Sequence, residues 1–172
     1  MKKNNKGFTL IDLLVVVAII GILAAVGTVA YTGYTACAKK STAKANHASA
    51  VKFIAAEDMK CNTGETTVMT KASTPLTCAD RTGDDVIVSA SLALADFKNP
   101  YATSKQAVRP NTGDSAATVT SSKNADRGYV NLTASGNTIT VTTCFDDTTD
   151  TGNSACTAGA VDSVTNTILV GE

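Results

Sequence analysis

Apolar residues are distributed unevenly, so the chain divides into a long apolar run near its beginning and a mostly polar remainder. Residues 8–30 form a stretch of 23 residues with a single charge, Asp12. At about 1.5 Å per residue, a helix of that length crosses a bilayer core of roughly 30 Å. The pattern therefore predicts a membrane-spanning helix over residues 8–30, preceded by a short basic segment over residues 1–6 that is typical of the front end of an export signal.

Beyond residue 30 the apolar side chains recur three and four positions apart, which predicts that the helix continues to about Met59. The expected apolar stripe comprises Tyr31, Tyr34, Ala38, Ala45, Ala48, Val51, Phe53, Ile54 and Ala55. The opposite face would carry Lys39, Lys40, Lys44 and Lys52. We therefore expect residues 31–60 to be an amphipathic helix packed on a head of residues 61–172.

The clearest strand signal lies in the second half of this head. Polar and apolar residues alternate over 129–133 and 138–142, on either side of Ser135-Gly136-Asn137, which predicts a hairpin. A last strand is expected from Val164 to Val170. The side chains expected to point into the core are Val130, Leu132, Ile139, Val141, Ile168 and Val170.

Weaker signals cover the first half of the head. We expect an extended piece from Thr66 to Lys71, a strand over 86–88 after a turn at 81–85, a short helix from Ser91 to Phe97 and an irregular connection over 101–114. Together these elements predict an α+β fold, in which one long helix packs on a small antiparallel sheet.

Five cysteines in an exported chain suggest disulfides with one thiol left over. Four of them flank polar loops, which favours the sequential pairs Cys61–Cys78 and Cys144–Cys156. A continuous helix would separate Cys37 from Cys61 by about 36 Å, far beyond disulfide range. We expect Cys37 to be a small buried residue, with an intermolecular bridge as the alternative.

The chemistry of the chain gives no support for catalysis. His47 is the only histidine, and no Gly-x-Ser-x-Gly, phosphate loop or zinc motif accompanies it. We therefore expect no enzyme activity, no cofactor and no metal site. One alternative is a calcium site in the loop bracketed by Cys144 and Cys156, whose oxygen ligands would be Asp146, Asp147, Asp150 and Asn153.

Charge also argues against nucleic acid as a general partner. Fifteen basic and fifteen acidic residues balance, and loss of a leader containing three lysines leaves an acidic excess. The helical lysines could form a track for DNA, but a solvated helix face or contact with lipid headgroups is the better interpretation.

The residues Gly7-Phe8-Thr9-Leu10-Ile11-Asp12, after the basic leader, resemble the class III signal of type IV pilins. This resemblance implies the type IV pilin fold, removal of residues 1–7 as a leader through cleavage between Gly7 and Phe8 by a prepilin peptidase, N-methylation of Phe8 and retention of the apolar helix. The sequence departs from the family pattern at two places. Asp12 stands where a glutamate is usual, and Val29 stands where many members have a proline.

Asp12 is the strongest candidate for a functional residue. A carboxylate in an apolar helix costs about 2.5 to 3.5 kcal/mol on insertion scales unless it is paired. Its own chain offers little help, whereas the resemblance implies pairing with the new α-amino group of Phe8, so that an incoming subunit is placed in register. Thr9 either adds a hydrogen bond there or is a simple helix N-terminal threonine. The alternative for Asp12 is an unpaired charge near the lipid headgroups.

The resulting hypothesis is a structural subunit of a type IV pilus, a homopolymer that supports adhesion, motility or DNA uptake. It would reside in the inner membrane before the pilus assembly machinery incorporates it into an extracellular filament. A minor pilin or a type II secretion pseudopilin is one alternative. A monomeric, membrane-anchored extracytoplasmic binding domain is another.

Overall fold

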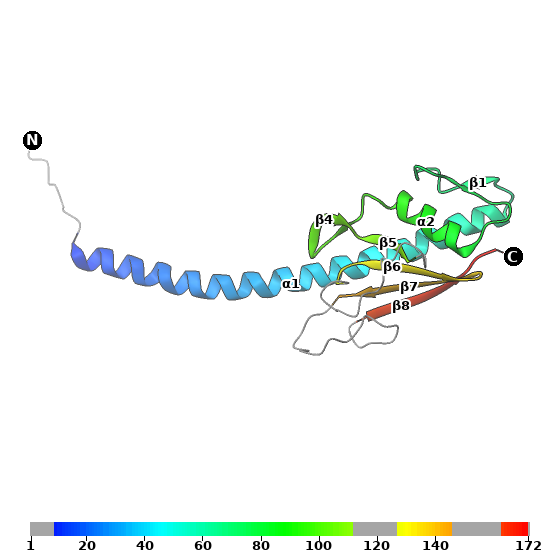
Figure 1. Ribbon diagram of the computed structural model, residues 1–172. Coiled ribbons are helices and arrows are strands. Elements are labelled where there is room, and N and C mark those ends of the chain that lie inside the picture. Colours follow the sequence, from blue (N-terminus) through cyan, green and yellow to red (C-terminus); the bar gives the residue numbers. More distant parts are fainter. Residues whose placement is uncertain (1–8, 112–126, 146–162, 172) are drawn as a thin grey trace, which may run out of the picture. The chain divides into compact units, whose positions relative to one another are not determined.

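A computed structural model describes residues 9–111, 127–145 and 163–171 of this chain (Figure 1). It forms two compact units, residues 1–38 and 39–172. The helices are α1 (Leu10–Asn62) and α2 (Gly83–Ala93). The strands are β1 (Thr67–Val68), β2 (Leu76–Thr77), β3 (Lys98–Asn99), β4 (Ala102–Gln106), β5 (Val108–Asn111), β6 (Val130–Ser135), β7 (Thr138–Cys144) and β8 (Ser163–Leu169).

The first unit contains the apolar part of α1. The helix runs without a break from Leu10 to Asn62, three residues beyond the predicted end, so the expectation of one unbroken helix is confirmed. It is long and apolar enough to cross a membrane. The hydroxyls of Thr28, Thr32 and Thr35 each donate to the backbone carbonyl three residues earlier, at 3.0 Å. These polar side chains are therefore satisfied within the helix itself, as an apolar environment requires.

Within the second unit, the buried face of α1 differs from the predicted stripe. Ala45, Ala48 and Ala55 are exposed. The buried residues are Ala43, His47, Ala50, Ile54, Glu57 and Asp58, which follow each other at steps of mostly three and four. Of the predicted stripe, only Ile54 is fully buried. Alanines lie all round this part of the helix and mark no face, so the true face is set by polar residues that find partners in the head.

The main sheet has the strand order β5-β6-β7-β8 (Figure 1). The hairpin β6–β7 confirms the prediction, with Leu132 opposite Val141 and Ala134 opposite Ile139. Val130, Leu132, Ile139 and Val141 are fully buried, as expected, and belong to one core with residues of α1 and α2.

The two edges of the sheet differ from one another. β8 pairs antiparallel with β7, and Val170, just beyond β8, is buried as predicted, while Ile168 is partly buried. β5 instead runs parallel to β6. The irregular connection predicted over 101–114 is wrong over β4 and β5. Pro110 lies inside β5, which it can do because an edge strand leaves one side of its backbone unpaired.

Helix α2 replaces both the strand predicted at 86–88 and the helix predicted from Ser91 to Phe97. Thr82 and Asp85 form a reciprocal capping box that starts the helix. Val86, Ile87 and Ala90 are fully buried at helical spacing. The three-residue apolar run was too short to distinguish a strand from a buried helix, and the capping box was the signal that could have decided.

Gly83, the first residue of α2, permits a close approach to the hairpin turn. A Cβ placed there would lie 2.4 Å from the backbone oxygen of Gly136 and 3.0 Å from the Cβ of Ala134. The hairpin can therefore contact the start of α2 only because residue 83 has no side chain.

Candidate assembly site

Thr9 and Asp12 form a capping box at the start of α1. The Thr9 hydroxyl donates to Asp12 Oδ2 at 2.6 Å, and the Thr9 backbone N–H donates to the same oxygen at 3.1 Å. The Asp12 backbone N–H donates in return to Thr9 Oγ1 at 3.2 Å. The first backbone N–H groups of a helix have no carbonyl of an earlier turn to bond. Here the side chains of Thr9 and Asp12 accept hydrogen bonds from them.

The capping box corrects the expectation for Asp12, whereas the predicted cleavage site stays a prediction. The chain does supply partners for Asp12, whereas little help was expected from it. Thr9 starts the helix as its N-cap and donates to Asp12. Gly7 and Phe8, at the predicted cleavage and methylation site, lie outside the described residues, so cleavage between them remains a prediction.

The helix that follows Asp12 presents apolar side chains to its surroundings. From Leu10 to Val29 the large apolar side chains are between 44% and 79% exposed in the single chain. A surface of this size needs lipid or other apolar helices around it. The N-terminal unit therefore combines one carboxylate at the beginning of a helix with an apolar surface on every side.

In the head, the end of α1 is fixed by a disulfide. Cys61 and Cys78 are bonded, with 5.4 Å between their Cα atoms, which confirms this predicted pair. The bond ties the end of α1 to the segment that follows β2. The loop between the two cysteines contains the short pair β1–β2.

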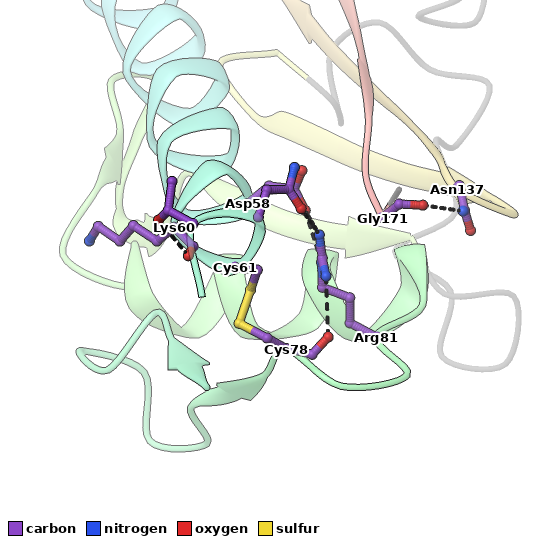
Figure 2. A network of polar contacts seen from close by, with 9 residues as sticks. Asp58, Lys60, Cys61, Cys78, Arg81, Asn137 and Gly171 are labelled. Carbon is purple, nitrogen blue, oxygen red and sulfur yellow. Dashed lines mark hydrogen bonds and ion pairs between the residues drawn. A yellow bond between two sulfur atoms is a disulfide. The ribbon is translucent and has the colours of Figure 1, made fainter. Parts of the chain in front are cut away.

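Arg81 connects the same region to α1 by polar contacts (Figure 2). Its Nε donates to Asp58 Oδ1 at 2.9 Å, and its Nη1 donates to the carbonyl of Cys78 at 3.2 Å. Its Nη2 donates to Asn62 Oδ1 at 2.9 Å. Both members of the ion pair are buried, with side-chain exposures of 9% for Arg81 and 8% for Asp58.

Glu57, one position earlier on α1, supports the disulfide loop. Its Oε2 accepts the backbone N–H of Met69 at 2.5 Å, and its Oε1 pairs with Lys60. Met69 is buried and has a φ of 54°, a left-handed conformation that is unusual for a residue with a side chain. Burial raises the pKa of Glu57, but the bonds from Lys60 and Met69 outweigh it, so the pKa lies below its ordinary value.

His47 joins α1 to two strands of the sheet. The ring is 3% exposed. Its Nδ1 lies 3.0 Å from Thr143 Oγ1 and its Nε2 lies 2.8 Å from Asn166 Oδ1. Burial lowers the pKa of His47, and the hydrogen bond to Asn166 offsets part of that effect. His47 is therefore a buried residue that packs against the head.

Three of the helical lysines lie over aromatic rings. The Nζ atoms of Lys40 and Lys44 lie 5.3 Å and 4.4 Å from the ring centre of Phe145. Lys39 Nζ lies 5.9 Å from the ring centre of Tyr101. These cations contact aromatic rings of the head, while Lys39, Lys44 and Lys52 are exposed, as expected for a solvated helix face.

The remaining cysteines and acidic residues complete the predicted set. Cys37 is free and exposed, so the expectation that it is buried is wrong. It precedes Ala43, the first residue of α1 that the head buries. Cys144 is disulfide-bonded, and its predicted partner Cys156 lies outside the described residues. The suggested calcium ligands Asp146, Asp147, Asp150 and Asn153 also lie outside them.

Sequence reasoning missed Glu57, Asp58 and Arg81, and it did not foresee the partners of His47. Two adjacent acids near the end of an otherwise alanine-rich helix were the available signal. The distant partners of these two acids are Met69 and Arg81, and no local pattern links those positions to the helix.

Comparison with known proteins adds evidence for the N-terminal region. Residues 2–28 match the family model of the prokaryotic N-terminal methylation motif. The chain is 58% identical over 43 residues to the type IV major pilin protein PilE1 of Neisseria gonorrhoeae, which covers 25% of this chain and 26% of that protein. The fimbrial protein of Neisseria meningitidis serogroup B is 58% identical over 43 residues, covering 25% of each chain.

The type IV major pilin protein PilA of Myxococcus xanthus is 55% identical over 43 residues, covering 25% of this chain and 20% of that protein. The chain thus matches about a quarter of the length of these curated relatives. No solved structure matches the chain significantly. The matched region contains the methylation motif and the apolar helix, and the head adds an α+β fold closed by a disulfide. The N-terminal quarter of this chain is therefore similar to that of type IV major pilins, and its α+β head with a disulfide fits the type IV pilin fold.

Proposed function

We propose that this protein is a structural subunit of a type IV pilus, which polymerises through the apolar part of α1 after its leader is removed. The observation that carries the proposal is the match of residues 2–28 to the methylation motif, on a helix whose apolar side chains are exposed all round. A filament core of packed helices would bury that surface.

Asp12 is proposed to place an incoming subunit in register. Thr9 donates twice to Oδ2 of Asp12, and among the described residues none donates to the other carboxylate oxygen. That oxygen is available to the α-amino group that cleavage would create at Phe8, on the same or an adjacent subunit. A pair between the two charges would offset the cost of a carboxylate in an apolar environment.

The proposed partners are copies of this chain, a prepilin peptidase and the pilus assembly machinery. The subunit would wait in the inner membrane, with the head outside the cytoplasm, and would then enter an extracellular filament. A disulfide in the head agrees with an oxidising compartment. The proposed subunit is an abundant one, and a minor pilin is the alternative.

The test is the intact mass and N-terminal sequence of the protein in material sheared from the surface of producing cells. We expect an abundant species that begins with methylated Phe8 and lacks the seven-residue leader. A scarce species with the same N-terminus would indicate a minor pilin or pseudopilin. Recovery only from membranes, with Met1 still present, would overturn the proposal in favour of an anchored monomeric domain.

A further inference from the structure

His47, the only histidine of the chain, is buried at the contact between α1 and the main sheet. Both of its ring nitrogens have partners, and these come from two different strands. Thr143 belongs to β7, and Asn166 belongs to the edge strand β8. The Asn166 contact is a side-chain hydrogen bond between α1 and β8.

These partners suit the neutral imidazole. The Asn166 amide oxygen can only accept, so Nε2 carries the hydrogen of the neutral ring. Nδ1 then has a lone pair and accepts from the Thr143 hydroxyl. Protonation adds a hydrogen to Nδ1, so the hydroxyl must turn and become the acceptor. Its own hydrogen would then lack a partner, because Thr143 is fully buried and its hydroxyl has no second partner among the described residues.

The charged side chains that line the groove around His47 are cations. On α1 itself, Lys44 and Lys52 line the same groove as His47. Phe145, just beyond β7, and Ser163, Val164 and Asn166 of β8 also line the groove, and none of them ionises in the physiological range. The described lining of the groove therefore includes cations but no carboxylate. The groove has a volume of about 550 Å³ and gives water a route to the ring.

We propose that His47 is an acid-sensitive latch, which holds edge strand β8 against α1 while the imidazole is neutral and releases the strand when the imidazole gains a proton. The rest of the sheet does not depend on this contact, because the β6–β7 hairpin is held by its own ladder and by the core. The latch therefore loosens β8 locally. The inference is independent of whether the chain forms filaments.

The direction of the pH dependence follows from the neutral preference of the folded state. The lowered pKa of the buried ring means that the folded protein binds this proton less readily than the unfolded chain. The contribution of the neutral His47 ring to the stability of the folded state is fully present above its ordinary pKa of 6.5. It is lost as the pH falls from that value to the lower pKa of the folded state.

The experiment uses the full chain in detergent micelles. Nuclear magnetic resonance follows the imidazole, which needs no assignment because the chain has one histidine. Hydrogen exchange, corrected for intrinsic rates, follows the amides of β8 and of the β6–β7 hairpin between about pH 7.5 and about pH 5. We expect the protection of β8 relative to the hairpin to fall about tenfold as the imidazole titrates, equivalent to about 1.4 kcal/mol.

Three variants make the result specific. Asn166→Asp places a carboxylate at Nε2, which favours the charged ring, so β8 should keep its protection in acid. His47→Gln cannot gain the proton, and its β8 protection should not change with pH in this range. Ser49→Asp adds the same charge on an exposed position of α1 and should release β8 as the wild type does.

Two results would overturn the latch. One is a β8 protection that stays constant, or falls together with that of the hairpin, while His47 titrates. The other is an Asn166→Asp protein that releases β8 in acid as the wild type does, which decides the matter even if His47→Gln fails to fold.

Discussion

Arg81 and Asp58 form a buried ion pair that joins the end of α1 to the segment leading into α2. The guanidinium Nη2 lies 2.9 Å from Asp58 Oδ1, and both side chains are less than a tenth exposed. The same guanidinium contacts the carbonyl of Cys78, a member of the disulfide (Figure 2). It also contacts Asn62, the last residue of α1.

Replacing Arg81 by methionine should lower the free energy of unfolding of the head by about 3 to 5 kcal/mol, because Asp58 would be left as a buried, unpaired charge. Urea denaturation of the full chain in detergent micelles measures this. The control is Lys71→Met, which breaks the exposed pair with Asp96 and should cost less than about 1 kcal/mol. Equal losses in the two variants would show that burial does not set the strength of the Arg81 pair.

The charge of Asp12 and its capping role can be separated by mutation. Asp12→Asn retains an oxygen that can accept from Thr9 but removes the charge, and it should abolish filaments. Thr9→Ala removes the hydroxyl at a cost of about 1 kcal/mol of helix stability and should leave filaments intact. Electron microscopy and the yield of sheared surface protein report on assembly. Normal filaments from Asp12→Asn would refute the pairing role.

The Cys61–Cys78 disulfide should stabilise the head by about 3 kcal/mol, the chain-entropy estimate for a loop of this size. Replacing both cysteines by alanine should therefore lower the free energy of unfolding by about that amount, as measured by urea denaturation. Cys37→Ala is the matched control, because Cys37 is free and exposed and its loss should change nothing. An unchanged midpoint in the double variant would contradict the expected contribution.

Gly83 should not tolerate a side chain. Gly83→Ala would force the start of α2 away from the hairpin turn, at a cost of about 1 to 3 kcal/mol. Gly33→Ala serves as the control, because no atom lies within 4 Å of its added Cβ. That change should be neutral or should stabilise the helix by up to about 1 kcal/mol. Thermal denaturation followed by circular dichroism compares the two variants.

Glu57 predicts a second pH dependence of stability. It has the same direction as that of His47, but here the folded state favours the charged form of the side chain. Its pKa in the folded state lies below the ordinary 4.5, because the bonds from Lys60 and Met69 outweigh the burial that raises it. The contribution of the Glu57 carboxylate to the free energy of unfolding is therefore present above pH 4.5. It is lost as the pH falls through the lowered pKa of the folded state. Glu57→Gln should flatten the stability profile below that pH.

The exposed Glu65→Gln provides the control for Glu57→Gln. Both variants lose one carboxylate, but only Glu57 accepts the Met69 backbone N–H. Urea midpoints measured across the acid range should differ between them. If Glu57→Gln retains the wild-type slope, the carboxylate of Glu57 does not carry this dependence.

Local sequence patterns by themselves determined several parts of this protein. The length and apolar character of the first 30 residues predicted the helix, and the alternation around Ser135-Gly136-Asn137 predicted the β6–β7 hairpin with its four core residues. Polar flanking segments predicted the Cys61–Cys78 pair. The motif around Gly7-Phe8 indicated the family. These signals act within one element or between close neighbours in the chain, so a sequence displays them directly.

Only the tertiary structure decided which face of α1 is buried and that β5 joins the sheet in parallel. The reason is that polar residues can be buried wherever distant partners satisfy them. His47 requires Asn166, and Asp58 requires Arg81, at separations of 119 and 23 residues. Hydrophobic periodicity contains no information about such pairs, because the partner, and not the residue itself, makes burial favourable.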